Sequence, residues 1–250
     1  MSEAAAVQSK VRYIANAENF SKIPGSPIAY WVSEKMFQAF CQKHISDVAD
    51  TCMGMTTGDN GRFLRLWFEV LQLKIKFNAK DNSEAKESKA KWFPYHKGGE
   101  YRRWYGNNDY IVNWENDGGS LKAFTGSTIR NTQFYFREAI TWSLITSSIN
   151  SFRYRPIGFV FGDAGPAVFA KQSELYILLA LLNTKITQSV SEIINPTINC
   201  SSGVVANFPA LLDLDNRNDI SDIVLCNINI SKSDWDNYET SWDFKKHPLI

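Results

Sequence analysis

The sequence is poor in the residues that build metal sites and disulfides. Its 250 residues include four cysteines and three histidines, no two cysteines have C-x-x-C spacing, and the histidines lie far apart. A structural zinc site needs four such ligands close together, so this pattern argues against a metal centre. Scattered cysteines are typical of a reducing compartment, and we therefore expect a cytoplasmic protein.

Long apolar runs are lacking as well. The longest, residues 175–182, is far too short to cross a bilayer. Residues 1–6 show no positive charge followed by an apolar stretch, which a secretory leader would have. We expect neither a leader nor a membrane partner.

An excess of charge of one sign is also absent, because the formal net charge is +1. The charge is nevertheless uneven along the chain. Residues 211–250 hold eight Asp or Glu against four Lys or Arg, whereas residues 86–103 hold six Lys or Arg against two Glu. A local basic face beside an acidic tail fits a polyanion-binding domain, although an ordinary solvated surface can look the same.

Motifs for catalysis are missing from the chain. The stretch 58–61 has the wrong spacing for a dinucleotide loop and no Gly-Lys-Ser/Thr follows it. The stretch 195–198, Asn-Pro-Thr-Ile, begins like the Asn-Pro-Pro-Tyr loop of amino-methyltransferases but lacks its second proline and its aromatic ring, so we interpret it as a helix end. Asp109 and Glu115 do not form the carboxylate and lysine cluster of a metal-dependent nuclease. We predict no catalytic and no metal-binding residues.

The periodicity predicts an α+β fold, strand-rich with a few packing helices. Runs of aromatic and β-branched residues predict strands, and apolar residues at helical spacing predict helices. Residues 78–90 read as a loop, and the tail from residue 213 reads as polar, with Trp235 and Trp242 as isolated anchors. The predicted strands cover 63–77, 110–114, 137–149, 152–161 and 167–170, and the predicted helices cover 28–40, 173–186 and 187–194.

Three long runs of the sequence resemble one family. They are IPGSPIAYWVSEKM (23–36), TTGDNGRFLRLWFEV (56–70) and KWFPYHKGGEYRRWYGNNDYIVNWENDG (91–118). In this order they resemble the PglX-type adenine-specific DNA methyltransferases of BREX phage-defence systems, and the resemblance runs from about residue 11 to the end. In that family a methyltransferase domain that binds S-adenosylmethionine precedes a target-recognition domain.

The resemblance implies that this chain is the target-recognition region without the catalytic half. We divide it into an N-terminal extension (1–22), a DNA target-recognition domain (23–212) and an acidic C-terminal segment (213–250) that leads into a missing region. No cofactor is expected in this chain, since S-adenosylmethionine would bind the missing methyltransferase domain. The implied partners are double-stranded DNA, a methyltransferase domain or subunit, and other BREX proteins.

Three elements are candidates for DNA contact. The first is a glycine loop of the kind that target-recognition domains often carry before a strand. Its glycines would let the backbone approach a DNA strand, with hydroxyl, amide and arginine groups on the phosphates. A structural turn with Asn60 at positive φ is the alternative. The residues are Gly54, Thr57, Gly58, Asn60, Arg62 and Arg65.

The second element is the basic stretch, which we define as residues 91–108. Its cations can neutralise phosphates, arginine can grip guanine, asparagine can pair with adenine, and its aromatic rings can stack on DNA or pack beneath it. A folded aromatic hairpin with solvated cations is the alternative. Its candidate residues are Lys91, Tyr95, Lys97, Arg102, Arg103, Trp104, Tyr105, Asn107 and Asn108.

The third element is Arg130, Asn131, Gln133 and Arg137, whose polar side chains suit base edges. A loop with capping roles would look the same. Two other functions stay open for the whole chain. It could be an interaction fragment that docks to other BREX components without reading DNA, or a complete small enzyme, which the missing motifs disfavour. The DNA sequence that it recognises cannot be deduced from one chain.

Overall fold

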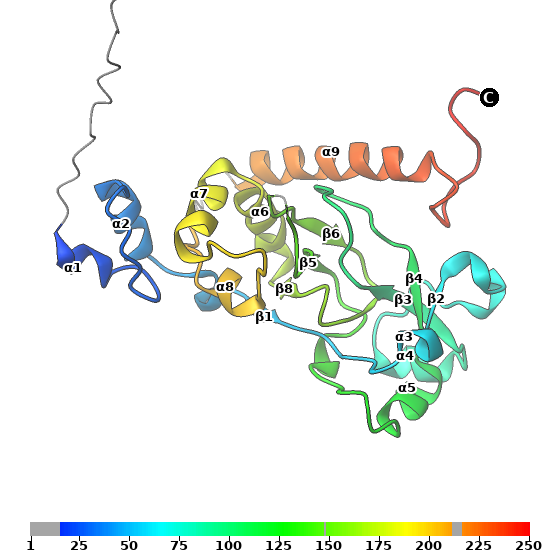
Figure 1. Ribbon diagram of the computed structural model, residues 1–250. Coiled ribbons are helices and arrows are strands. Elements are labelled where there is room, and N and C mark those ends of the chain that lie inside the picture. The colour runs from blue at the N-terminus through cyan, green and yellow to red at the C-terminus, as the bar shows by residue number, and fades with distance from the viewer. Residues whose placement is uncertain (1–15, 148, 212–216) are drawn as a thin grey trace, which may run out of the picture.

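The computed structural model describes residues 16–147, 149–211 and 217–250. Two sheets and the helices around them form the molecule, and the N-terminal helices lie at the end opposite the second sheet (Figure 1). The predicted α+β class is confirmed. Most of the predicted N-terminal extension and the start of the acidic segment lie outside the described residues.

The first sheet has the order β1-β8-β5-β6, and all its pairs are antiparallel. Ile140 and Val168, paired across β5 and β8, belong to a core beneath the helices. Residues that alternate with them, such as Ala167 and Phe169, belong to a second core. The strands are β1 (Asp50–Cys52), β5 (Ala139–Thr141), β6 (Arg153–Arg155) and β8 (Ala167–Phe169).

The second sheet has the order β2-β4-β3-β7, in which only the β3–β7 pair is parallel. Phe93 and Val112 of this sheet lie in the same core as Phe169, so the two sheets share it. The β3–β4 pair makes the basic stretch part of an aromatic hairpin, as its alternative interpretation predicted. The strands are β2 (Leu64–Leu66), β3 (Trp92–His96), β4 (Tyr110–Asn113) and β7 (Val160–Phe161).

Two helices of the leucine-rich segment confirm the predicted periodicity. α6 (Gln172–Leu182) buries Leu175, Leu178 and Leu179 against the first sheet. α7 (Lys185–Ile194) starts where Thr184 accepts a hydrogen bond from the Thr187 amide, and it ends before Asn195, as interpreted from the sequence. Among the described residues no single helix is long and apolar enough to cross a membrane. The α6–α7 pair passes that test only together, across a bend of 74°.

The polar tail contains the longest described helix, α9 (Arg217–Asp236), so the prediction of isolated anchors is wrong. α9 lies along α6 (Figure 1) and buries Val224 and Ile228 in the core of the helices. Burial of two such side chains contributes roughly 1.5–3 kcal/mol each. Tryptophans of the tail also pack inward, with Trp242 against Phe77 and Phe159.

The predicted long strands are shorter in the structure. Within residues 63–77 only β2 is a strand, and Ile75 adds a single bridge to Trp92, because the Glu69 carboxylate accepts a hydrogen bond from the Leu66 amide and 3-10 turns follow at Trp67–Glu69 and Gln72–Lys74. Residues 152–161 split into β6 and β7, since Pro156 lacks a donor and Gly158 has a φ of 100°. Among the described residues of 137–149, which leave out residue 148, only β5 is a strand.

Short helices fill the connections. The predicted helix 28–40 is α2 (Glu34–Phe40), which begins at the Ser33 cap. The predicted loop 78–90 contains α4 (Asn82–Glu87), because Asp81 caps it and Ala85 is buried. The other helices are α1 (Ala17–Phe20), α3 (Asn60–Phe63), α5 (Glu115–Lys122) and α8 (Ser202–Ala206).

Candidate nucleic-acid interface

The glycines of the first element approach the protein's own backbone. A Cβ atom on Gly54 would lie 1.9 Å from the carbonyl oxygen of Phe161. One on Gly58, which has a φ of 71°, would lie 2.2 Å from the carbonyl oxygen of Gly126. Both positions therefore exclude a larger residue because of contacts within the protein, whether or not DNA approaches them.

The polar residues of this loop hold it in shape. Thr57 is buried, and its hydroxyl donates to the Asn60 side-chain oxygen at 2.6 Å. Asp59 caps α3 by accepting from the Arg62 amide at 3.0 Å. The positive φ falls on Gly58 and not on Asn60, which starts α3. The Asn60 side chain is exposed, although its Oδ1 accepts from the enclosed Thr57 hydroxyl.

Two arginines follow the loop and differ in their partners. The Arg62 guanidinium lies over the rings of Phe63 and Phe124, at 5.1 and 5.2 Å from their centroids, and its side chain is exposed. Arg65 donates to the carbonyl oxygens of Gly61 and Leu64 at 2.6 Å each. Arg62 therefore presents its charge to solvent, whereas much of the donor capacity of Arg65 is used within the protein.

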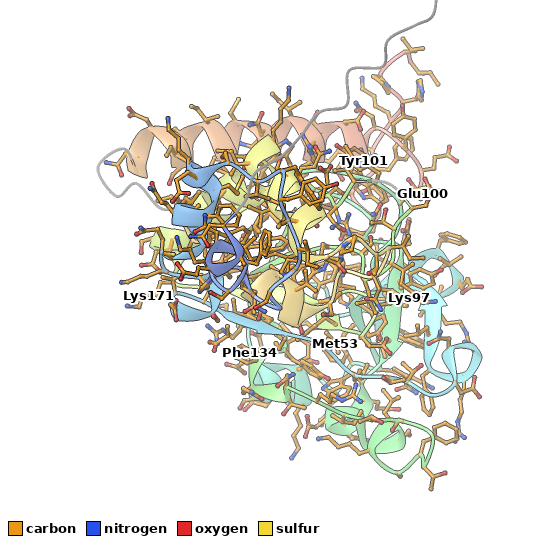
Figure 2. The ribbon with its side chains drawn as sticks, turned by 60° about the vertical axis from the view of Figure 1, so that its left-hand side comes forward. Met53, Lys97, Glu100, Tyr101, Phe134 and Lys171 are labelled. Atoms are coloured by element: carbon orange, nitrogen blue, oxygen red, sulfur yellow. The ribbon has the colours of Figure 1, made fainter. Side chains whose placement is uncertain are left out.

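The third element lies directly beside the glycine loop. Thr56 and Thr128 exchange backbone hydrogen bonds of 2.9 and 2.8 Å. The Asn131 amide donates to the Met53 carbonyl at 2.8 Å, and Figure 2 shows Met53 near Phe134 of the same segment. Asn131 has a left-handed backbone, and its side chain holds the neighbouring segment rather than capping the helical turn that follows it.

The two segments together carry the loop face, as we name a set of five exposed side chains. Arg137 lies over Phe134 and Phe169, at 5.3 and 5.8 Å from the ring centroids, and Arg130 reaches the Thr56 hydroxyl at 3.5 Å. In the part of the chain that the structure describes, none of its three arginines forms an ion pair. The loop face consists of Asn60, Arg62, Arg130, Gln133 and Arg137.

Three predicted contacts of the basic stretch lie inside the protein. Tyr95 is 3% exposed, and burial raises the pKa of its hydroxyl. Tyr105 is 5% exposed, and burial raises its pKa to about 12. Asn107 is buried and donates to the Glu100 carbonyl at 2.8 Å. All three side chains are enclosed by the protein and present almost no surface to DNA.

The arginines of the basic stretch face the tail of the chain. Arg102 forms an ion pair with Asp234 of α9, lies over the Trp235 ring at 5.0 Å, and donates to the Tyr105 carbonyl at 3.1 Å. The Arg103 carbonyl accepts from Ser231 of α9 at 2.9 Å, and its side chain lines a cavity beside α7. The spacing of Ile220, Val224 and Ile228 is the sequence signal that could have revealed this helix.

The two lysines of the basic stretch lie over aromatic rings. Lys97 is half-buried, with its ammonium 4.7 Å from the Tyr110 centroid. Lys91 is exposed beside Trp92, at 5.7 Å from that ring's centroid. The basic stretch is therefore not one continuous cationic surface.

Two further arginines were missed by the sequence interpretation because they lie in a strand. Arg153 and Arg155 of β6 are buried. Burial lowers the pKa of Arg153 to about 10 and that of Arg155 to about 9. Arg153 donates to the Arg102 carbonyl and Arg155 to the Arg137 carbonyl, each at 3.2 Å, so both hold the backbone of predicted contact residues.

No cluster of three or more His, Cys, Asp or Glu that could hold a metal ion occurs within residues 16–147, 149–211 and 217–250. The loop face therefore offers three guanidinium groups without ion pairs among the described residues, together with two side-chain amides. Guanidinium groups bind anions, and amides bind hydrogen-bond donors and acceptors.

Comparison with known proteins identifies similar sequences. No family model matches the chain. It is 38% identical over 248 residues to the adenine-specific methyltransferase PglX of Lacticaseibacillus casei (strain Zhang), a match over 95% of this chain and 20% of that protein. It is also 38% identical over 235 residues to the adenine-specific methyltransferase BrxX of Escherichia coli O9:H4 (strain HS), over 93% of this chain and 18% of that protein.

These matches confirm the resemblance predicted from the sequence. The chain spans about one fifth of the length of the two relatives, so it is similar to a part of each.

Proposed function

We propose that this chain is the DNA target-recognition part of an adenine-specific DNA methyltransferase of a BREX phage-defence system. The observation that carries the proposal is the loop face, where three exposed arginines have no acidic partner among the described residues. Such groups bind phosphates and release counterions. The similarity to adenine-specific methyltransferases supports DNA as the polyanion.

The loop face is suited to contact DNA without large rearrangement. Aromatic rings beneath Arg62 and Arg137 restrict the guanidinium groups, so less side-chain entropy is lost on binding. The arginines bind phosphates and so position the protein on the DNA backbone. The amides of Asn60 and Gln133 form hydrogen bonds with base edges. Specificity therefore rests on the two amides and on any arginine that reaches the major groove.

Catalysis requires a partner with the methyltransferase motifs that this chain lacks. The relatives are about five times longer than their match to this chain, which leaves room for such a domain. S-adenosylmethionine binds that domain, either within a longer polypeptide or in a separate subunit. The four free cysteines support the predicted cytoplasmic location.

The experiment is a salt titration of duplex DNA binding. We expect weak binding, in the micromolar range or looser at physiological salt, that falls steeply as salt rises. The Arg62→Ala/Arg130→Ala variant should bind more weakly and show a smaller salt slope. Lys35→Ala is a matched control, since Lys35 is an exposed cation on α2, at the other end of the molecule (Figure 1). An affinity that does not change with salt concentration, or an equal loss of affinity in the two variants, would contradict the proposal.

A second function is favoured by an exposed apolar segment between β2 and β3. Phe68, Leu71 and Leu73 are 60, 63 and 86% exposed. Adjacent exposed apolar side chains of this kind mark protein contacts. We propose that this segment docks to the methyltransferase part. Leu71→Ser/Leu73→Ser should then lose binding to a separately expressed methyltransferase half but keep the salt-dependent DNA binding. Retained association would remove this second role.

A further inference from the structure

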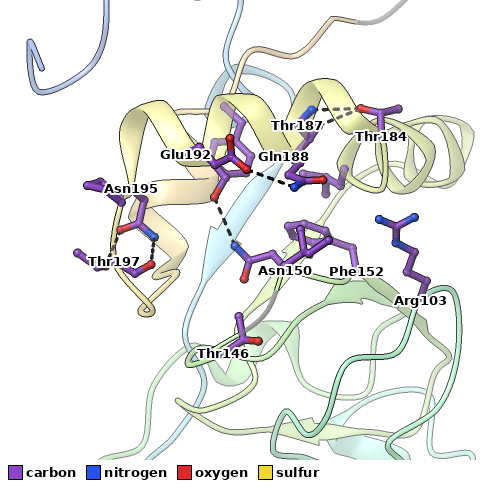
Figure 3. A pocket seen from close by; sticks show the side chains of 15 residues that line it. Arg103, Thr146, Asn150, Phe152, Thr184, Thr187, Gln188, Glu192, Asn195 and Thr197 are labelled. Carbon is purple, nitrogen blue, oxygen red and sulfur yellow. Dashed lines mark hydrogen bonds between the residues drawn. The ribbon is translucent and has the colours of Figure 1, made fainter. Parts of the chain in front are cut away.

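A cavity of about 460 Å³ opens between α7 and the segment that leads into β6. Phe152, Leu182 and Phe208 contribute apolar surface to its lining. Polar side chains from α7 and from residues 146–150 surround that surface, and Arg103 lies at one end (Figure 3). The size falls within the range of small-molecule sites, roughly 300–1,000 Å³.

One end of the cavity is cationic. Arg103 forms no ion pair within the described residues, and its guanidinium carbon lies 5.8 Å from the centroid of the Tyr101 ring. Its Nε is buried and has no hydrogen-bond partner among those residues. An unpaired guanidinium at the end of a cavity is matched by an anion of the size of a phosphate.

The opposite end accepts hydrogen bonds. Glu192 lies across the cavity from Arg103 (Figure 3), and the Gln188 amide donates to its Oε1 at 3.2 Å. Among the described residues no protein group donates a hydrogen bond to its Oε2. Asn150 holds Ser191 only through a long 3.4 Å bond, and its Oδ1 is buried without a partner, so rotation of this amide would offer an acceptor to a ligand.

We propose that this cavity binds a nucleoside 5′-monophosphate whose base carries an exocyclic amine. The phosphate pairs with Arg103, the base packs on the exposed apolar lining at Ile149 and Pro196, and the amine donates to Glu192. The cationic end of the cavity then binds an anion, the acceptor end binds a hydrogen-bond donor, and the flat base covers the apolar lining. The nucleotide is either free in solution or an unpaired nucleotide of a DNA strand. This site goes beyond the proposed DNA contact, because it shares no residue with the loop face.

The first test is calorimetric titration of the full chain with dAMP, dCMP, dTMP and deoxyadenosine. Because dTMP has no exocyclic amine and deoxyadenosine no phosphate, each should bind at least about tenfold more weakly than dAMP, the range for one hydrogen bond to a charged group. dCMP should bind like dAMP. Equal binding of all four, or no heat with any of them at millimolar concentration, would overturn the proposal.

Variants assign each end of the ligand. Arg103→Gln should make dAMP bind no better than deoxyadenosine, and Arg103→Lys should restore part of the difference. Glu192→Gln should remove the preference for dAMP over dTMP. Lys80→Gln is the matched control, because it removes an exposed cation from the connection between β2 and β3. It should change neither the preference for dAMP over deoxyadenosine nor that for dAMP over dTMP. Melting temperatures near that of the parent show that the variants are folded, and preferences unchanged in both site variants would overturn the assignment.

The source of the nucleotide is decided by competition. A duplex with one unpaired adenine should displace dAMP if the cavity serves DNA, while a fully paired duplex should not. If neither duplex displaces dAMP, the cavity serves a free nucleotide. Loss of duplex binding in the Arg62→Ala/Arg130→Ala variant leaves dAMP binding intact, so this proposal can fail or hold independently of the proposed function.

Discussion

The loop face and the basic stretch start from similar residues and end in different roles. Both contain several arginines beside aromatic rings and glycines. On the loop face Arg62, Arg130 and Arg137 are exposed and form no ion pair among the described residues. In the basic stretch Arg102 is paired with Asp234, and the side chains of Tyr95, Tyr105 and Asn107 are enclosed.

The difference shows that the density of positive charge along a sequence does not measure the charge that is available at the surface. The basic stretch is the more cationic segment, yet α9 brings an acidic and aromatic surface to it. An acidic tail in a chain with a basic face can therefore neutralise that face within the molecule. Four experiments test this contrast between the loop face and the basic stretch.

The largest effect should come from the contact that assembles the loop face. In Gly58→Ala the new methyl group would meet the Gly126 carbonyl, and alanine disfavours a φ of 71°. We expect a loss of about 3 kcal/mol or more in the free energy of unfolding, measured by urea denaturation. Gly61→Ala is the control, since its Cβ meets only the Asp59 side chain at 3.5 Å within α3. Equal stability of the two variants would show that the loop is not held in this way.

The second effect concerns His96 of the basic stretch, whose buried imidazole stays neutral in the folded protein. Burial lowers the pKa of His96 well below 6.5, and the charges of Arg153 and Arg155 lower it further. The unfolded chain gains a proton near pH 6.5 and the folded chain does not, so stability is present above that pH and falls below it, by up to about 1.4 kcal/mol per pH unit. His96→Gln should be less stable at pH 7 but flatter between pH 7 and 5. Parallel urea curves for the two proteins across that range would contradict this assignment.

The third effect separates the two regions by DNA affinity. Each of Arg62→Ala and Arg130→Ala should lower the salt slope by about one and weaken binding about eightfold at 0.1 M salt, the value for one lost phosphate contact. Arg102→Ala should leave both quantities unchanged, because its guanidinium is paired with Asp234. Fluorescence anisotropy with one labelled duplex measures all three. A larger loss in Arg102→Ala would reverse the comparison and place DNA on the basic stretch.

The smallest effect is the ion pair itself. The side chains of Arg102 and Asp234 are 27 and 57% exposed, so solvent screens them. A double-mutant cycle with Arg102→Ala and Asp234→Ala should give a coupling energy of about 0.2–1 kcal/mol, reduced by high salt. The single Arg102→Ala variant should cost more than that, since it also loses the Trp235 contact and the Tyr105 hydrogen bond. A coupling of zero would mean that α9 is held by its apolar contacts alone.

Part of the site could be predicted from sequence. The resemblance directed attention to both segments of the loop face, and turn chemistry explains why the glycine loop ends at a capped helix. The availability of each cation could not be predicted. Tyr95 and Tyr105 have the composition of stacking platforms, and only their packing shows that they are core residues. The cavity beside α7 also lacked a sequence signal, because its lining comes from four separate segments.

Local sequence signals were enough for the α+β class, for the two helices between residues 172 and 194, and for the similarity to a part of the adenine-specific methyltransferases. For the helices these signals are leucines at helical spacing, the Thr184 cap, and a proline after the second helix. Which arginines lack an ion pair depends instead on the packing of distant segments. The partner of Arg102 lies 132 residues away, and Gly58 meets a backbone 68 positions further along. Local periodicity carries no information about such pairs, because they form only when the packing of the sheets and of α9 closes the long loops between them.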